Sequence, residues 1–165
     1  MPLKVLNLNK NKITDLGALY LARMLKLNDG LLFFYIAWNN IQKRGATAIA
    51  RKLSTNERLQ IFDFSFNNFG SKTRFLPGQS IETNYAEAFA DLFAANKTLL
   101  HVDLSHNNIG SDDCAKIAKG LNRNHTMFGL HMVGNEVDVD ALGFLRAPRA
   151  HPSISHLLTR IPDEL

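Results

Sequence analysis

The chain has 165 residues, of which 45% are apolar and 21% charged, so it can bury a sizeable core and does not have the composition of a disordered protein. Its net charge of +4 is mild and does not predict a nucleic-acid partner, because such a footprint needs clustered basic residues. A single cysteine excludes a disulfide framework and a cysteine-rich zinc site.

Nothing in the sequence predicts membrane insertion or export. The longest apolar run covers residues 31–38, far short of the ~20 residues that a membrane-spanning helix needs. The first residues, Met1 to Lys4, lead directly into patterned sequence and do not resemble a signal peptide. The ending, residues 162–165, faintly resembles an ER-retention signal, which has no meaning without a signal peptide. We therefore expect a soluble cytoplasmic protein with no membrane partner.

Five strings of the form L-x-x-L-x-L-x-x-N-x-I follow one another, beginning at residues 3, 31, 59, 99 and 127, and we number the units that they open one to five. Their asparagines are 28 residues apart, except for one interval of 40 residues between Asn67 and Asn107. Strand side chains alternate, so Leu6 and Leu8 are expected to point inward. The predicted strands centre on residues 5–7, 33–35, 61–63, 101–103 and 129–131.

The second half of each of the first four units predicts a helix. In unit one, Ala18, Leu21, Ala22 and Leu25 stand at i, i+3, i+4 and i+7, the spacing of a buried helical stripe, and the same columns recur in the next three units. An asparagine closes each helix, and asparagine tolerates the left-handed conformation that a helix exit often needs. These asparagines are Asn28, Asn56, Asn96 and Asn124, and the predicted helices cover residues 14–28, 43–55, 84–96 and 111–123.

Two segments depart from the period. Unit three gains 12 residues, and the insertion at about 70–83 predicts a loop that either binds a partner or folds back on its own unit. Removing residues 71–82 would restore the period, and we expect the shortened chain to fold. Unit five loses its pattern before Pro148, which ends any helix early. The chain therefore divides into a repeat domain, residues 1–145, and a basic C-terminal cap or tail, residues 146–165.

These strings and stripes resemble the leucine-rich repeats of the ribonuclease-inhibitor class, with their 28-residue strand–loop–helix unit, over residues 3 to about 145. The resemblance implies an α/β fold, a right-handed α/β solenoid with parallel strands on its concave side and helices on its convex side. It also implies an asparagine ladder that satisfies backbone groups where each strand turns toward its helix. The ladder residues are Asn11, Asn39, Asn67, Asn107 and Asn135.

The concave side of units two and three is the candidate binding surface. Alternation along the strands gathers five large apolar side chains there, and large exposed apolar patches commonly mark interaction sites. The alternative is that curvature buries part of this patch. Two carboxylates border it with a histidine beside the second, and a basic side chain of a partner would relieve their repulsion. The candidate residues are Phe33, Tyr35, Trp38, Ile61 and Phe66, with Asp63, Asp103 and His131.

No pattern predicts catalysis or metal binding. His101, Asp103 and Ser105 share one strand face, but the same Asp-x-Ser spacing recurs one unit earlier, so it follows the repeat rather than a catalytic design. His101, His106 and His131 are too few to favour zinc over a solvated His–Asp pair. We therefore predict no enzyme, no metal site and no cofactor, and an inert core thiol for the single cysteine.

The leading hypothesis is a protein-interaction scaffold without enzymatic activity, a subunit of a larger intracellular assembly, because solenoids present a long surface and no enclosed pocket. The resemblance implies the same, and short cytoplasmic repeat proteins of protists and cilia suggest an axonemal or cytoskeletal assembly. A GTPase activator and an enzyme inhibitor on the same repeats are the alternatives. Further partner surfaces are the insertion, the basic tail and the N-terminal edge, where Leu3 opens a unit with no polar cap. Either a longer array continues there or another chain covers that edge.

Overall fold

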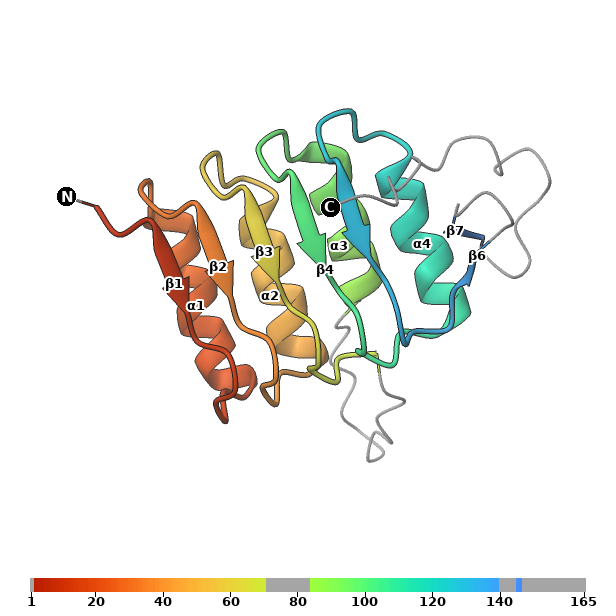
Figure 1. The fold of residues 1–165 in the computed structure, drawn as a ribbon, viewed down its shortest axis with the longest axis horizontal. Helices are drawn as coiled ribbons and strands as arrows, with labels where there is room; N and C mark the ends of the chain where they lie inside the picture. Colours follow the sequence, from red (N-terminus) through yellow and green to blue (C-terminus); the bar gives the residue numbers. More distant parts are fainter. Residues whose placement is uncertain (1, 71–83, 140–144, 147–165) are drawn as a thin grey trace.

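The structure, a computed structural model, describes residues 2–70, 84–139 and 145–146. It is a stack of strand–turn–helix units in which each unit packs on the next along the chain (Figure 1). Most of the insertion, residues 71–83, and the tail beyond residue 146 lie outside the described residues. The expectations for those two segments therefore remain predictions.

Five short strands form one sheet, in which each strand pairs in parallel with the next along the chain. The register follows the repeat: Val5 lies beside Phe33, Phe33 beside Ile61, Ile61 beside His101, and His101 beside Gly129. The longer unit three therefore leaves the register of the sheet unchanged. The strands are β1 (Val5–Asn7), β2 (Phe33–Tyr35), β3 (Ile61–Asp63), β4 (His101–Asp103) and β5 (Gly129–His131), which confirms the predicted positions.

Four helices lie side by side on one face of this sheet (Figure 1). No described helix covers the other face, which we call the open face. The helix bounds agree with the predicted ones to within two residues. The α/β repeat fold that the sequence predicted is thus confirmed. The helices are α1 (Asp15–Leu27), α2 (Lys43–Leu53), α3 (Tyr85–Ala95) and α4 (Ser111–Leu121).

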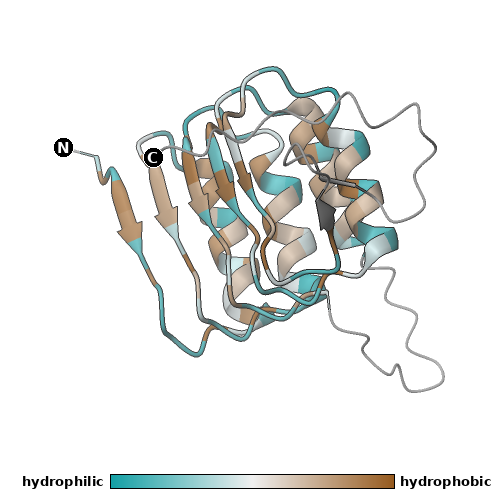
Figure 2. Cartoon of the chain, turned by 45° about the vertical axis from the view of Figure 1, so that its right-hand side comes forward, coloured by the Kyte–Doolittle hydropathy of each residue, from teal (hydrophilic) through white to brown (hydrophobic). Residues whose placement is uncertain are grey.

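The core lies between the sheet and the helices, and aromatic rings fill its middle. In Figure 2, apolar residues, coloured brown, recur in the strands and helices, whereas long stretches of the turns that join them are hydrophilic and coloured teal. Phe64 has no exposed surface, and its ring centroid lies 5.2 Å from Phe62, 5.0 Å from Phe69 and 6.4 Å from Phe89. Phe34 of β2 stacks on Phe62 at 5.8 Å. One cluster of rings therefore joins units two and three.

Asparagines in the turns after the strands bond each unit to the one before it, as the resemblance implied. Asn107 has no exposed surface, and its Nδ2 donates to the carbonyl oxygens of Leu104 at 3.0 Å and, in unit three, Phe64 at 2.9 Å. Its Oδ1 accepts the N–H of Asn67 at 3.0 Å. Each such side chain therefore satisfies a donor and an acceptor of the preceding unit. The same arrangement recurs at Asn39, Asn67 and Asn135.

The asparagines at the helix exits also bond across units. Asn56 Nδ2 donates to the carbonyl oxygen of Leu25 in unit one at 2.8 Å, and its Oδ1 accepts two N–H groups of the turn that follows. The backbone φ angle is −87° at Asn28 and −73° at Asn96, so the prediction of a left-handed backbone at these helix C-termini is wrong. The side chain of the asparagine is what matters here: Nδ2 donates to a carbonyl oxygen of the neighbouring unit, and Oδ1 accepts N–H groups of the turn that follows.

Beyond the fifth strand the pattern changes, as the sequence predicted for unit five. β6 (Asp138–Val139) pairs antiparallel with β7 (Leu145–Arg146) in a separate two-stranded sheet. This pairing joins backbone on both sides of the predicted boundary at residue 145. The division into a repeat domain and a tail stays a prediction.

Candidate functional site

The open face carries the candidate residues in columns that run across the strands. Tyr35 lies beside Asp63, Asp63 beside Asp103, and Asp103 beside His131 on neighbouring strands. All four side chains are half-buried. The structure therefore brings the predicted aromatic and acidic residues onto one surface. The adjacent column holds Phe33, Ile61 and His101.

The position two residues beyond β2, β3 and β4 is buried. Ala37 is 2% exposed, and Ser65 and Ser105 are 6% exposed. Strand alternation would turn these side chains to the open face, beside Tyr35, Asp63 and Asp103, but the structure buries them. Main-chain bonds such as Trp38 N–H to Ser65 O, at 3.1 Å, hold successive turns against one another and enclose the small side chains between them.

Three rings stack on one another along the turns that follow β2, β3 and β4. The ring centroids of Trp38 and Phe66 are 4.0 Å apart with planes 9° from parallel, and those of Phe66 and His106 are 4.2 Å apart with planes 18° from parallel. Trp38 nevertheless keeps 52% of its surface exposed. The sequence placed Trp38 and Phe66 in the binding patch but left out His106, which it weighed as a metal ligand. The sequence signal that could have included His106 was its repeat position, which is equivalent to that of Trp38 and Phe66.

The stacked residues have an unusual backbone. The φ angles of Trp38, Phe66 and His106 are 57°, 51° and 55°, in the left-handed region that bulky residues rarely adopt. Such a conformation costs about 1–2 kcal/mol per residue. At the equivalent position of unit five stands Gly134, where an added Cβ would lie 2.3 Å from Nδ1 of His106. Glycine therefore lets the His106 ring lie directly over the backbone and closes one end of the stack.

The two carboxylates of the open face each use one oxygen. Asp63 Oδ1 accepts the N–H and the hydroxyl of Ser65 at 3.0 and 2.7 Å, and Asp103 Oδ1 accepts the N–H of Ser105 at 2.8 Å. Among the described residues, no Lys or Arg pairs with either carboxylate. Like charges on adjacent strands repel. Within the described part of the chain, the second oxygen of each carboxylate accepts no hydrogen bond, so a cation could pair with both residues.

Two histidines lie beside these carboxylates. The ring centroids of His101 and His131 are 4.6 Å apart, and Gly129 makes room for the first ring. Burial, and then His131, lower the pKa of His101, while Asp103 and Asp63 act in the opposite direction. Across the described residues no His, Cys, Asp or Glu group could hold a metal ion, and no hydrogen bond joins His101 to a serine.

Comparison with known proteins agrees with this geometry. A family model described as leucine-rich repeat matches residues 1–22, 31–50 and 95–118. The chain is a leucine-rich repeat protein. The matched segments contain β1, β2 and β4 with much of the helices α1, α2 and α4, and unit three repeats the same geometry. No curated protein matches the sequence significantly.

Solved structures share the fold of this leucine-rich repeat protein, and 44 chains match it significantly. One of them, described as "Leiomodin-1 Actin-Binding Site 2 (ABS2)", matches with a TM-score of 0.65 and 21% identity. The match covers 78% of this chain and 69% of that one, and at this identity it shows the fold alone. None of the described helices is long and apolar enough to cross a membrane.

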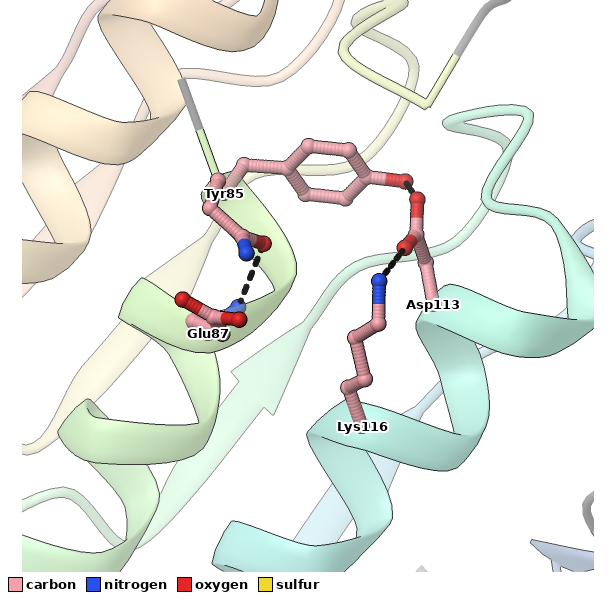
Figure 3. Close-up of polar contacts among 5 residues, drawn as sticks. Tyr85, Glu87, Asp113 and Lys116 are labelled. Carbon is pink, nitrogen blue, oxygen red and sulfur yellow. Dashed lines mark hydrogen bonds and ion pairs between the residues drawn. The ribbon is translucent and has the colours of Figure 1, made fainter. Parts of the chain in front are cut away.

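On the helix side of the leucine-rich repeats, a polar contact joins units three and four. Tyr85 in α3 donates its hydroxyl to Asp113 Oδ2 in α4 at 2.5 Å, and Lys116 pairs with Asp113 Oδ1 at 3.0 Å (Figure 3). Burial, and then the bond to Asp113, raise the pKa of Tyr85 well above its ordinary value, so its hydroxyl remains a donor at neutral pH. Asn84 caps the N-terminus of α3, because its side-chain Oδ1 accepts the N–H of Glu87 at 3.2 Å. These contacts position the helices.

Cys114 is expected to be unreactive in the folded protein. It is 5% exposed, and burial, followed by Asp113 and Glu136, raises the pKa of its thiol to about 12. Because the thiolate is the reactive form, a disulfide reagent such as dithionitrobenzoate should label the chain only after it unfolds in denaturant. The measurement is the rate of chromophore release at mildly alkaline pH. Fast labelling in the absence of denaturant would contradict this expectation.

Proposed function

We propose that this leucine-rich repeat protein is a non-enzymatic interaction module whose open face binds another protein across units two and three. The observation that carries the proposal is the stack of Trp38, Phe66 and His106, in which a tryptophan that stacks on Phe66 leaves 52% of its surface to solvent. Tryptophan is a frequent anchor at protein interfaces. A side chain that is already ordered loses little entropy when a partner covers it.

The acidic column supports a partner with basic side chains. Tyr35 and Asp63 lie side by side, and Asp103 follows on the next strand. The aromatic residues would provide buried area, and the free carboxylate oxygens would select a Lys or Arg and steer its approach. Complementary charge of this kind affects specificity and association rate more than it affects affinity.

Our proposal for the cellular setting is a cytoplasmic assembly, with the cytoskeleton or an axoneme as the first candidate. The leiomodin-1 structure is described as an actin-binding site of that protein, so monomeric actin is the first partner to test here. The two carboxylates also suit an inhibitor that covers a basic enzyme. The remaining alternative is a GTPase activator. A GTP-hydrolysis assay with and without the chain separates it from the assembly subunit and from the enzyme inhibitor.

Replacing Trp38 or Tyr35 with alanine is expected to weaken binding by about 2 kcal/mol or more each, if they are interface hot spots. Binding would be titrated with actin or with the partner recovered by affinity capture, and thermal unfolding would be measured for each variant. Phe128, which is 76% exposed in unit five, provides a matched control, because Phe128→Ala removes an exposed ring outside the patch. Asp103→Asn should mainly slow association and reduce its dependence on salt.

The opposite pattern would refute the proposed site. If Trp38→Ala and Tyr35→Ala left affinity unchanged but lowered the unfolding temperature strongly, the ring stack would be a structural element. The partner surface would then lie elsewhere, and the insertion and the basic tail would be the next segments to test.

A further inference from the structure

Two histidines and two aspartates of the open face lie close enough to influence one another's charge. Asp103 of β4 lies between Asp63 of β3 and His131 of β5. His101 is also in β4, and its ring centroid lies 4.6 Å from that of His131. Gly129 permits this approach, because a Cβ at that position would lie 2.7 Å from Nδ1 of His101. We call the two histidines and the two aspartates the His–Asp cluster.

The cluster decides when His101 carries a charge. Burial lowers the pKa of His101 most, followed by His131, and the two aspartates oppose this only in part. Because the described helices lie on the other face of the sheet, the groups that act on His101 come from β3, β4 and β5 (Figure 1). They are Asp63, Asp103 and His131. Two imidazolium rings at this distance repel, so protonation of one ring disfavours protonation of the other.

Protons bound by the cluster change the charge that a partner meets. Among the described residues, no Lys or Arg forms an ion pair with Asp63 or Asp103, so the negative charge of both is offered to a partner. Each proton that a histidine takes up adds a positive charge beside these carboxylates and offsets one of theirs. All four side chains are half-buried, and charges in such positions are screened less than exposed ones. Histidine is also the side chain whose ordinary titration lies near neutral pH.

We propose that the His–Asp cluster is a pH switch, which holds a basic partner on the open face at neutral pH and releases it as the histidines take up protons. This inference rests on the proposed function, because it assumes that the open face binds a protein with basic side chains. The coupling is reciprocal: a bound guanidinium group disfavours protonation of the neighbouring imidazoles. Binding at mildly acidic pH therefore expels protons from the cluster.

The test uses a tetra-arginine peptide as the basic probe, because guanidinium groups stay charged over the whole pH range. Calorimetry measures its affinity for the chain at about pH 8 and about pH 5, which span the titration of histidine. The affinity should fall at least about fivefold at the lower pH. Titrations at about pH 6 in two buffers with different ionisation enthalpies should show that binding releases protons.

Variants assign the effect to the cluster. In a double variant, His101→Asn with His131→Asn, the affinity should no longer depend on pH and proton release should disappear. His125→Asn is the matched control, because it removes an exposed histidine outside the cluster and should keep both effects. Asp103→Asn should weaken binding of the probe at about pH 8, which would place the probe at the cluster.

Two measurements need no partner. In nuclear magnetic resonance titrations of the imidazole signals, the pKa of His101 should lie below the ordinary histidine value and should rise in the His131→Asn variant, which lacks the neighbouring charge. Because the unfolded chain takes up this proton at a higher pH than the folded chain, stability in urea should fall as the pH drops below the ordinary histidine value. His101→Asn should reduce that fall.

The outcomes separate this inference from the proposed function. Equal affinity of the probe at both pH values would overturn the switch and leave the binding site intact. The switch would also be refuted if the double variant kept the pH dependence, or if His131→Asn left the titration of His101 unchanged. A probe that binds at neither pH would refute the basic partner and the switch together, whereas the Trp38 and Tyr35 variants test the aromatic part of the site independently.

Discussion

Replacing Phe64 with alanine is expected to lower the free energy of unfolding by about 3–5 kcal/mol. Phe64 has no exposed surface and contacts the rings of Phe62, Phe69 and Phe89, so the change removes a buried ring and leaves a cavity that its rigid neighbours cannot fill. The measurement is equilibrium unfolding in urea, followed by the helical signal. Phe128→Ala, at a side chain that is 76% exposed, should change stability by less than about 0.5 kcal/mol.

A small loss for Phe64→Ala would show that the cluster repacks. That outcome would appear as a change below about 1 kcal/mol with the same dependence on denaturant as the unchanged chain, so that the cavity term is absent. The ring contacts between units two and three would then contribute less to the stability of the array than their burial indicates.

Replacing Asn107 with alanine is expected to cost about 3 kcal/mol, because it leaves a buried backbone donor without a partner. The N–H of Asn67 has the Oδ1 of Asn107 as its acceptor, and three carbonyl oxygens lose a bond from Nδ2 at the same time. Asn11→Ala is the matched control at the same repeat position. Its side chain is exposed and bonds only to two carbonyl oxygens of its own turn, so its loss should cost well under about 1 kcal/mol.

Urea unfolding of the two variants decides the matter. Equal losses for Asn107→Ala and Asn11→Ala would mean that the asparagine acts within its own turn and that the bonds between units add nothing. A large loss for Asn107→Ala alone would assign its effect to the bond with the preceding unit. Amide exchange at Asn67 should accelerate only in the Asn107→Ala variant, since that is where the donor is released.

The elements could be predicted from the sequence because one pattern specifies the same local structure five times. The apolar residues of the strand strings and the i, i+3, i+4, i+7 stripes fixed strands and helices to within two residues of their observed bounds. The turn asparagines were also predictable, since a polar residue that recurs between two apolar segments must satisfy backbone groups. Asn107, for example, has the predicted role, and the structure adds the identity of its four backbone partners.

The details of the candidate site were less predictable, because they depend on contacts between units. Ser65 and Ser105 were expected on the open face, yet turns that bond to one another enclose them. The stacking of Trp38 on Phe66 requires a left-handed backbone in consecutive turns, and bulky residues give no local signal for that conformation.

The asparagine ladder has a direction, so shortening the array breaks different bonds at its two ends. Each ladder asparagine bonds to the preceding unit. Removing unit five would therefore take away Asn135 Oδ1, which accepts the N–H groups of Asn107 and Ile109. These backbone N–H groups cannot rotate toward water. Removing unit one would free the side chain of Asn39, which keeps bonds to two carbonyl oxygens of its own turn. It would also take away the acceptors of two backbone N–H groups of unit two: Asn9 Oδ1 for Ala37 and the carbonyl oxygen of Ile13 for Asn40. Removing either end unit therefore leaves backbone donors of the turns without their acceptors, and only at the C-terminal end is the lost acceptor a ladder asparagine.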